Sequence, residues 1–137
     1  MIYSSPFNIN EYSSEIINKF QNEGVIVFGT GNFGSLAKSA LKQRNININF
    51  FVDNNFNNWG KKFEGIEIIS AKDILKKNPL SSILIASLNF KYLKRQLKDL
   101  GINNFYDIDF LFDKFDISNT STKWSKDRCK VQLDLYN

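Results

Sequence analysis

GVIVFGTGNFGS, residues 24–35, is the stretch of sequence that decides the fold. Its four apolar residues at 25–28, VIVF, are typical of a short strand that is buried on both faces of a parallel sheet. They run directly into a G-x-G-x-x-G pattern made by Gly29, Gly31 and Gly34. The next residues place apolar side chains on one face of a helix. The stretch therefore predicts a strand, a tight glycine turn and a helix, which is the context in which this pattern holds a phosphate group.

The rest of the chain alternates between short apolar strands and amphipathic helices. Helices are predicted over residues 10–22, 33–44, 71–77 and 89–101. Strands are predicted over 25–28, 48–52, 65–69, 82–87 and 103–108, and residues 56–65 are expected to form an irregular loop or a short hairpin. This alternation is typical of an α/β fold with three layers, helix, sheet and helix. Because parallel strands need right-handed crossovers, we predict a Rossmann-like, mostly parallel sheet of about five strands in the order 3-2-1-4-5.

The composition excludes several kinds of active site. The 137 residues include one cysteine, Cys129, and no histidine, which excludes an intrachain disulfide, a catalytic triad that needs histidine and a histidine base. The N-terminus lacks a signal-peptide pattern, and no apolar run approaches the roughly 18 residues of a membrane span. We therefore expect a cytoplasmic protein without a membrane span. The net charge of +4 is mild, and no nucleic-acid partner is expected from it.

The chain is expected to contain one domain and a tail. Residues 1–113 are predicted to form the Rossmann-like nucleotide-binding domain, with the helix over 10–22 as a lead-in element. From residue 114 the sequence becomes polar and weakly patterned. Residues 114–137 are therefore predicted to be a linker or a docking tail.

The glycine turn is the first candidate for ligand binding. Gly29 allows the chain to turn sharply off the strand, Gly31 lets the backbone approach a phosphate, and Gly34 lets the helix pack closely on the sheet. The N–H groups and the dipole at the start of the helix add an anion site. The alternative is a structural turn that holds no ligand.

Polar side chains at the ends of two other strands are the further candidates. Asp53 follows Gly34 by 19 residues, close to the spacing at which an acid meets a ribose hydroxyl, although it also suits a turn carboxylate. Ser87 and Asn89 leave the strand on the other side of the switch point, where they either meet a ligand or cap the next helix. Trp59 lies on the loop after Asp53, where it either stacks on a base or, as we prefer, packs under the loop.

The segments VIVFGTGNFG, FFVDNN, WGKKFEGIEIIS and ASLN together resemble the small Rossmann-like domain at the N-terminus of PglD-type sugar acyltransferases. Related domains accompany glycosyltransferases and methyltransferases of surface-polysaccharide biosynthesis. The resemblance covers about residues 23–108 and implies a site for the nucleotide part of a UDP-sugar. It places the phosphates on Gly29, Gly31, Asn32, Phe33 and Gly34, and the base or ribose near Asp53 and Asn54. The hexapeptide-repeat domain with its catalytic histidine is missing from this sequence, so acetyl transfer is not implied.

These observations lead to one favoured function and two alternatives. The favoured function is a binding module without catalytic chemistry of its own, which holds a nucleotide or a UDP-type nucleotide-sugar for bacterial surface-polysaccharide biosynthesis. Its expected protein partner is a transferase or a second copy of the chain. The alternatives are an NAD(H)-binding oxidoreductase or redox sensor, which the motif and Asp53 equally permit, and a structural or oligomerising domain with a vestigial site. The predicted ligand-binding residues are Gly29, Thr30, Gly31, Asn32, Phe33, Gly34, Asp53, Asn54, Ser87 and Asn89, and no catalytic or metal-binding residue is assigned.

Overall fold

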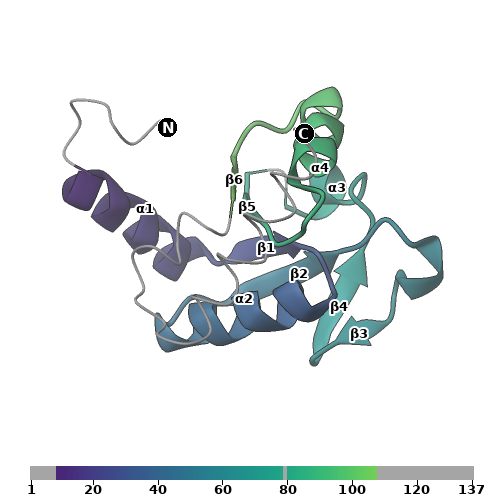
Figure 1. Cartoon of the computed structure of the whole chain (residues 1–137), viewed down its shortest axis with the longest axis horizontal. Coiled ribbons are helices and arrows are strands. Elements are labelled where there is room, and N and C mark those ends of the chain that lie inside the picture. Colours follow the sequence, from purple (N-terminus) through teal and green to yellow (C-terminus); the bar gives the residue numbers. More distant parts are fainter. Residues whose placement is uncertain (1–8, 79, 108–137) are drawn as a thin grey trace, which may run out of the picture.

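The computed structural model describes residues 9–78 and 80–107, which form one sheet with helices on both of its faces (Figure 1). The strands are β1 (Val25–Phe28), β2 (Ile48–Val52), β3 (Lys62–Phe63), β4 (Ile66–Ile69), β5 (Ser82–Ile85) and β6 (Phe105–Asp107). The helices are α1 (Ile9–Glu23), α2 (Asn32–Gln43), α3 (Ile74–Lys77) and α4 (Phe90–Asp99), and a short 3-10 helix, η2, spans Phe56–Asn58. Among the described residues, no helix is long and apolar enough to cross a membrane.

The strands lie in the order β3-β4-β2-β1-β5-β6. All neighbouring pairs are parallel except β3 and β4, which pair antiparallel. The five strands from β4 to β6 reproduce the predicted order 3-2-1-4-5, so the Rossmann-like α/β prediction is confirmed. The additional strand, β3, lies in the segment 56–65, predicted as a loop or short hairpin, and it forms a hairpin with β4, beyond that segment.

The strand β1 is buried on both faces because its side chains alternate between two cores. Val25 and Val27 belong to one hydrophobic cluster, and Ile26 and Phe28 belong to the other. All four are at most 1% exposed. A fully apolar strand therefore lies at the centre of the sheet, where each face is covered by helices.

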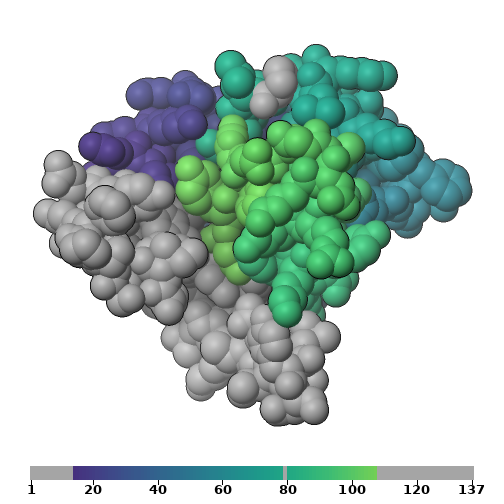
Figure 2. All heavy atoms as spheres, turned by 90° about the horizontal axis from the view of Figure 1, so that it is seen from above, coloured from purple at the N-terminus to yellow at the C-terminus, as the bar shows by residue number. Residues whose placement is uncertain are grey.

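Each face of the sheet is covered by its own pair of helices. On one face, α1 and α2 bury Phe20, Ala37 and Leu41 against the sheet. On the other face, α3 and α4 bury Ile74 and Leu97. Figure 2 shows the green segment that contains α4 at the molecular surface, which agrees with the amphipathic pattern of this helix.

The third helix differs from its prediction over residues 71–77. Its α-helical part begins only at Ile74 and ends at Lys77. Residues 71–73 form a turn in which the Ser70 Oγ accepts a hydrogen bond from the Asp73 N–H at 3.2 Å. Ser70 thus starts the segment as a cap residue does, but the next bonds join each N–H to the carbonyl three residues earlier, as in Ile74 N–H to Ala71 O. The predicted tail at 114–137, its boundary at 113 and Cys129 lie outside the described residues.

Candidate functional site

A cleft lies at the carboxyl ends of the central strands β1, β2 and β5. From β1 the chain proceeds to β2 on one side, whereas β5 pairs on the other side, so the cleft lies at the topological switch point of the sheet. Its volume is about 410 Å³, within the usual range for small-molecule sites. The lining residues are Phe28, Gly29, Thr30, Gly31, Asn32, Phe33, Val52, Asp53, Asn54, Ala86, Ser87, Leu88, Asn89 and Leu93.

The three glycines of the turn differ in what surrounds them. Gly29 has a positive φ of 136°, and a Cβ there would meet the carbonyl oxygen of Ala86 on the neighbouring strand end. A Cβ on Gly34 would meet the carbonyl oxygen of Gly29, so α2 packs closely against the turn. A Cβ on Gly31 would have no atom of the protein within 4 Å. Gly29 and Gly34 are therefore required by packing, whereas Gly31 faces the open cleft.

The helix α2 begins directly at this turn. Gly31 is its N-cap residue, with φ −87° and ψ −152°, and its carbonyl accepts the first helical bond from the Ser35 N–H at 3.1 Å. The N–H groups of a first helical turn have no partner within their own helix. Together with the helix dipole, they give this end of the cleft an attraction for anions.

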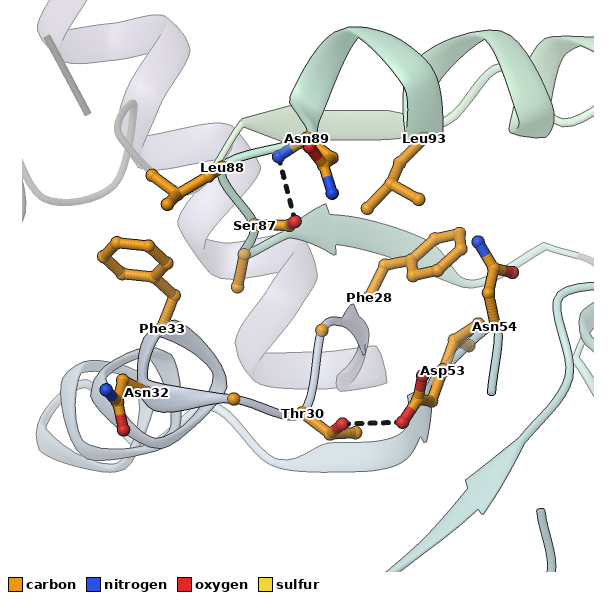
Figure 3. A pocket seen from close by; sticks show the side chains of 14 residues that line it. Phe28, Thr30, Asn32, Phe33, Asp53, Asn54, Ser87, Leu88, Asn89 and Leu93 are labelled. Carbon is orange, nitrogen blue, oxygen red and sulfur yellow. Dashed lines mark hydrogen bonds between the residues drawn. The ribbon is translucent and has the colours of Figure 1, made fainter. Parts of the chain in front are cut away.

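Asp53 follows β2 and is held by its neighbours at the edge of the cleft. Its Oδ2 accepts hydrogen bonds from the Thr30 hydroxyl and the Asn58 amide, both at 2.8 Å, and its Oδ1 accepts one from the Asn55 N–H at 2.9 Å. The bond from Thr30 joins the glycine turn to the end of β2 (Figure 3). These bonds fix the position of the carboxylate relative to the turn.

The environment of Asp53 also keeps the carboxylate ionised. Partial burial alone would raise its pKa, but hydrogen bonds from Asn55, Asn58, Thr30 and Asn54 to the carboxylate outweigh burial. The pKa of Asp53 therefore lies below its usual value of 3.8. A fixed negative charge faces the cleft at neutral pH.

The opposite wall of the cleft comes from the segment that links β5 to α4. The Ser87 Oγ accepts a hydrogen bond from the Asn89 N–H at 3.0 Å, and Leu88 points toward Phe33 across the cleft (Figure 3). Asn89 is the N-cap residue of α4 but makes no side-chain capping bond. Ser87 thus forms the local turn before α4, and both polar side chains still line the cleft.

The structure brings the predicted site residues together from three separate segments. Nine of the ten line the cleft, and the tenth, Gly34, supports the turn from behind. That they bind a ligand stays a prediction. Trp59 does not line the cleft; its Nε1 donates to the Asp53 carbonyl at 2.6 Å and its ring packs edge-on against Phe56. Trp59 is 45% exposed, so it contacts its own loop but is not packed under it as preferred from the sequence.

Other cleft residues carry no signal in the sequence that separates them from core residues. Phe28, Val52 and Leu93 read as core positions of a strand or helix, and they belong to the hydrophobic cluster on the α4 side. Asn58, which fixes Asp53, lies in a segment with several asparagines. Only the three-dimensional arrangement distinguishes it from its neighbours.

Among solved structures, Rex-family repressor structures are similar to this chain. The structure of RSP in complex with beta-NAD+ and operator DNA has a TM-score of 0.47 and 18% identity, over 74% of this chain and 51% of RSP. The structure of RSP described as a Rex-family repressor has a TM-score of 0.47 and 17% identity, over 74% of this chain and 53% of RSP. The structure of RSP in complex with beta-NADH has a TM-score of 0.45 and 17% identity, over 75% of this chain and 55% of RSP. The chain thus spans about half the length of these proteins.

Two predictions change with these comparisons. The mild charge predicts that nucleic acid is no partner, and this prediction is wrong, since one of the similar structures contains operator DNA. A net charge of +4 averages over the whole chain and does not report where basic side chains gather, so it excludes no such partner. The resemblance to PglD-type acyltransferases and the polysaccharide interpretation find no support in the comparisons.

The family comparison matches the central part of the chain. The matching model is that of the C2185-like, N-terminal family, and it covers residues 21–106, from the end of α1 to β6. The matched range includes the glycine turn, Asp53 and the segment before α4. No curated protein matches the chain. The chain belongs to the C2185-like, N-terminal family.

Proposed function

We propose that this chain binds an adenine dinucleotide, NAD(H), in the cleft at the switch point. The observation that carries the proposal is the contrast among the three glycines beside a fixed carboxylate. Gly29 and Gly34 are packed against backbone, whereas Gly31 is open toward the cleft. In dinucleotide-binding turns the second glycine is the one that the pyrophosphate approaches. The proposal concerns binding and assigns no catalytic residue.

The pyrophosphate is proposed to lie between Gly31 and the start of α2. The absence of a side chain at Gly31 leaves room for phosphate oxygens next to the backbone. The N–H groups of the first turn, at Asn32 and Phe33, are donors of the kind that bind phosphate at helix N-termini. Gly29, Thr30 and Gly34 shape this cradle.

The ribose next to the adenine is proposed to bind Asp53. A carboxylate has about four acceptor positions; Oδ2 accepts from Thr30 and Asn58, Oδ1 accepts from the Asn55 N–H, and the Asn54 N–H is a further donor to the carboxylate. A ribose hydroxyl is a suitable donor to it in place of one of these. The same negative charge would repel a 2′-phosphate. We therefore expect NAD(H) to bind more tightly than NADP(H). Ser87 and Asn89 are proposed to contact the remaining part of the dinucleotide from the opposite wall.

Isothermal titration calorimetry with NAD+, NADH, NADP+ and UDP-glucose tests the proposal. The unchanged chain is expected to bind NAD+ or NADH, with NADP+ at least about tenfold weaker, which corresponds to 1.4 kcal/mol. Gly31→Val should abolish binding because the added methyl groups would occupy the phosphate position. Gly31 has an extended backbone with a negative φ, and a Cβ there meets no atom within 4 Å, so we expect the fold to be retained. Lys98→Ala, on the exposed face of α4, is the matched control and should bind as the unchanged chain does.

Two results would contradict the proposal. If the chain binds UDP-glucose but no dinucleotide, the ligand of the cleft is a nucleotide-sugar and not NAD(H). Equal binding of NAD+ by the unchanged chain and by Gly31→Val would show that the glycine turn does not hold the pyrophosphate. Asp53→Asn serves as a second variant, and it should bring the affinities for NAD+ and NADP+ closer together because the repelling charge is removed.

A further inference from the structure

Two amide side chains form a bridge at one end of the cleft. The Asn54 Nδ2 donates to the Gln96 Oε1 at 2.8 Å, and the Gln96 Nε2 donates back to the Asn54 Oδ1 at 2.9 Å. The pair joins the segment after β2 to the second turn of α4, across 42 positions of sequence. No local pattern in the sequence requires these two residues to meet.

The amide pair also joins the linings of two hollows of the surface. Asn54 lines the main cleft. Gln96 lines a neighbouring hollow of about 270 Å³, together with Lys72, Tyr92 and Arg95 among others. The bonded pair joins a lining residue of the cleft to a lining residue of the hollow, and we take it as the partition between the two spaces. Loss of either side chain would open one space into the other.

The inference rests on the proposed function, which fixes the direction of the ligand in the cleft. With the pyrophosphate at Gly31 and the ribose at Asp53, the base continues past Asp53 away from the turn. Asn54 stands at that end, next to Phe28 and Leu93 (Figure 3). These two apolar side chains are almost completely buried and form the apolar floor at this end of the cleft, and the amide pair lies beside them, where we expect the edge of the base.

The chemistry of a reciprocal amide pair suits the edge of adenine. Each amide in the pair uses one N–H and one carbonyl lone pair, and it keeps a second N–H and a second lone pair. A donor and an acceptor therefore lie side by side along the edge of the pair. Adenine presents a donor, the N6 amino group, beside an acceptor, so the remaining N–H of one amide and the remaining lone pair of the other match this pattern.

We propose that the Asn54–Gln96 pair binds the adenine edge of the dinucleotide and closes the base end of the cleft. The two residues are then determinants of base specificity. A base that lacks the donor–acceptor edge and carries extra atoms there loses its hydrogen bonds to the pair and collides with the partition.

The test compares NAD+ with nicotinamide 1,N6-ethenoadenine dinucleotide, whose extra ring blocks N1 and N6 of the adenine. Titrations of the unchanged chain should give an affinity for NAD+ about tenfold or more above that for the etheno analogue. In Gln96→Ala the partition is open, so the analogue gains room in the neighbouring hollow and the two affinities should agree within about threefold. Asn54→Ala should behave in the same way, and Lys98→Ala should keep the ratio of the unchanged chain.

The outcomes distinguish this inference from the proposed function. If the unchanged chain binds both dinucleotides equally well, or if Gln96→Ala keeps the original ratio, the amide pair does not read the base and the inference is overturned while NAD(H) binding stands. If the folded, unchanged chain binds neither dinucleotide, the proposed function fails and the inference fails with it. Circular dichroism of each variant establishes that it is folded; Asn54 is exposed, so its replacement leaves the core untouched.

Discussion

Residues of the glycine turn are required for two different physical reasons. Gly29 combines a φ of 136° with a carbonyl oxygen, that of Ala86, in the place of a Cβ. A side chain there strains the backbone and pushes against the next strand. Gly31 has an ordinary φ and open space around it, so the fold itself does not require glycine at this position. The requirement at Gly31 comes from the proposed ligand.

This difference predicts losses of stability of different size for the same substitution at the two positions. Gly29→Ala should lower the free energy of unfolding by at least about 2 kcal/mol, through backbone strain and overpacking. Gly31→Ala should lower it by no more than about 1 kcal/mol, since only a preferred helix cap is lost. Urea denaturation of both variants measures the two values. Similar losses in both variants would show that Gly31 also has a structural role.

The lowered pKa of Asp53 predicts that the free energy of unfolding depends on pH. Because its folded-state pKa is lowered below 3.8, the stabilisation from its hydrogen bonds is complete above the unfolded value, near pH 4, and is lost as the pH falls through the folded value. Below about pH 4, the unchanged chain should therefore lose free energy of unfolding more steeply than Asp53→Asn, which cannot titrate. Denaturation at several pH values gives both slopes. Parallel slopes for the two proteins would be evidence that other carboxylates dominate.

Among the helices and strands, the strength of the hydrophobic pattern decides how accurately the sequence predicts their bounds. The strand VIVF and the helix α4 are predicted within two residues because every buried position is apolar. The helix α3 is predicted too early, since Ser70 starts a turn that becomes α-helical only at Ile74. The helix ends soon afterwards, at Lys77, and it has too few apolar positions to define its start.

The burial pattern of α4 predicts which of its side chains contribute to the free energy of unfolding. Leu97 is fully buried in the cluster between α4 and the sheet, whereas its neighbour Lys98 is exposed. Leu97→Ala should lower the free energy of unfolding by about 2–5 kcal/mol, since it removes buried methyl groups and leaves a cavity. Lys98→Ala should change it by less than about 0.5 kcal/mol. Chemical denaturation compares the two, and a small loss for Leu97→Ala would mean that α4 packs loosely.

For the molecule as a whole, the order of the strands explains why most of the cleft could be predicted. A parallel sheet with order 3-2-1-4-5 brings the ends of its first, second and fourth predicted strands to one place. The residues at those ends, in the glycine turn, at Asp53 and at Ser87, therefore had to meet. The contact between Asn54 and Gln96 depends instead on how α4 packs against the sheet. Such a contact has no signature in a single sequence.

The cleft also predicts how the ligand acts on the whole molecule. Its walls come from β1, β2, α2, α4 and the segments that follow β1, β2 and β5, so the site exists only when the sheet and both helix layers are assembled. A ligand that binds only this state stabilises it by RT ln(1 + [L]/Kd). At an NAD+ concentration 100 times the Kd, the free energy of unfolding should therefore rise by about 2.7 kcal/mol.

Urea titrations with and without NAD+ measure this gain. Gly31→Val, which keeps the fold and loses the phosphate position, should gain less than about 0.5 kcal/mol at the same NAD+ concentration. A gain in Gly31→Val equal to that of the unchanged chain would locate the NAD+ effect outside the cleft. If calorimetry detects binding but the unfolding free energy does not rise, the ligand also binds the unfolded chain, and the assembled strand ends are then not what creates the site.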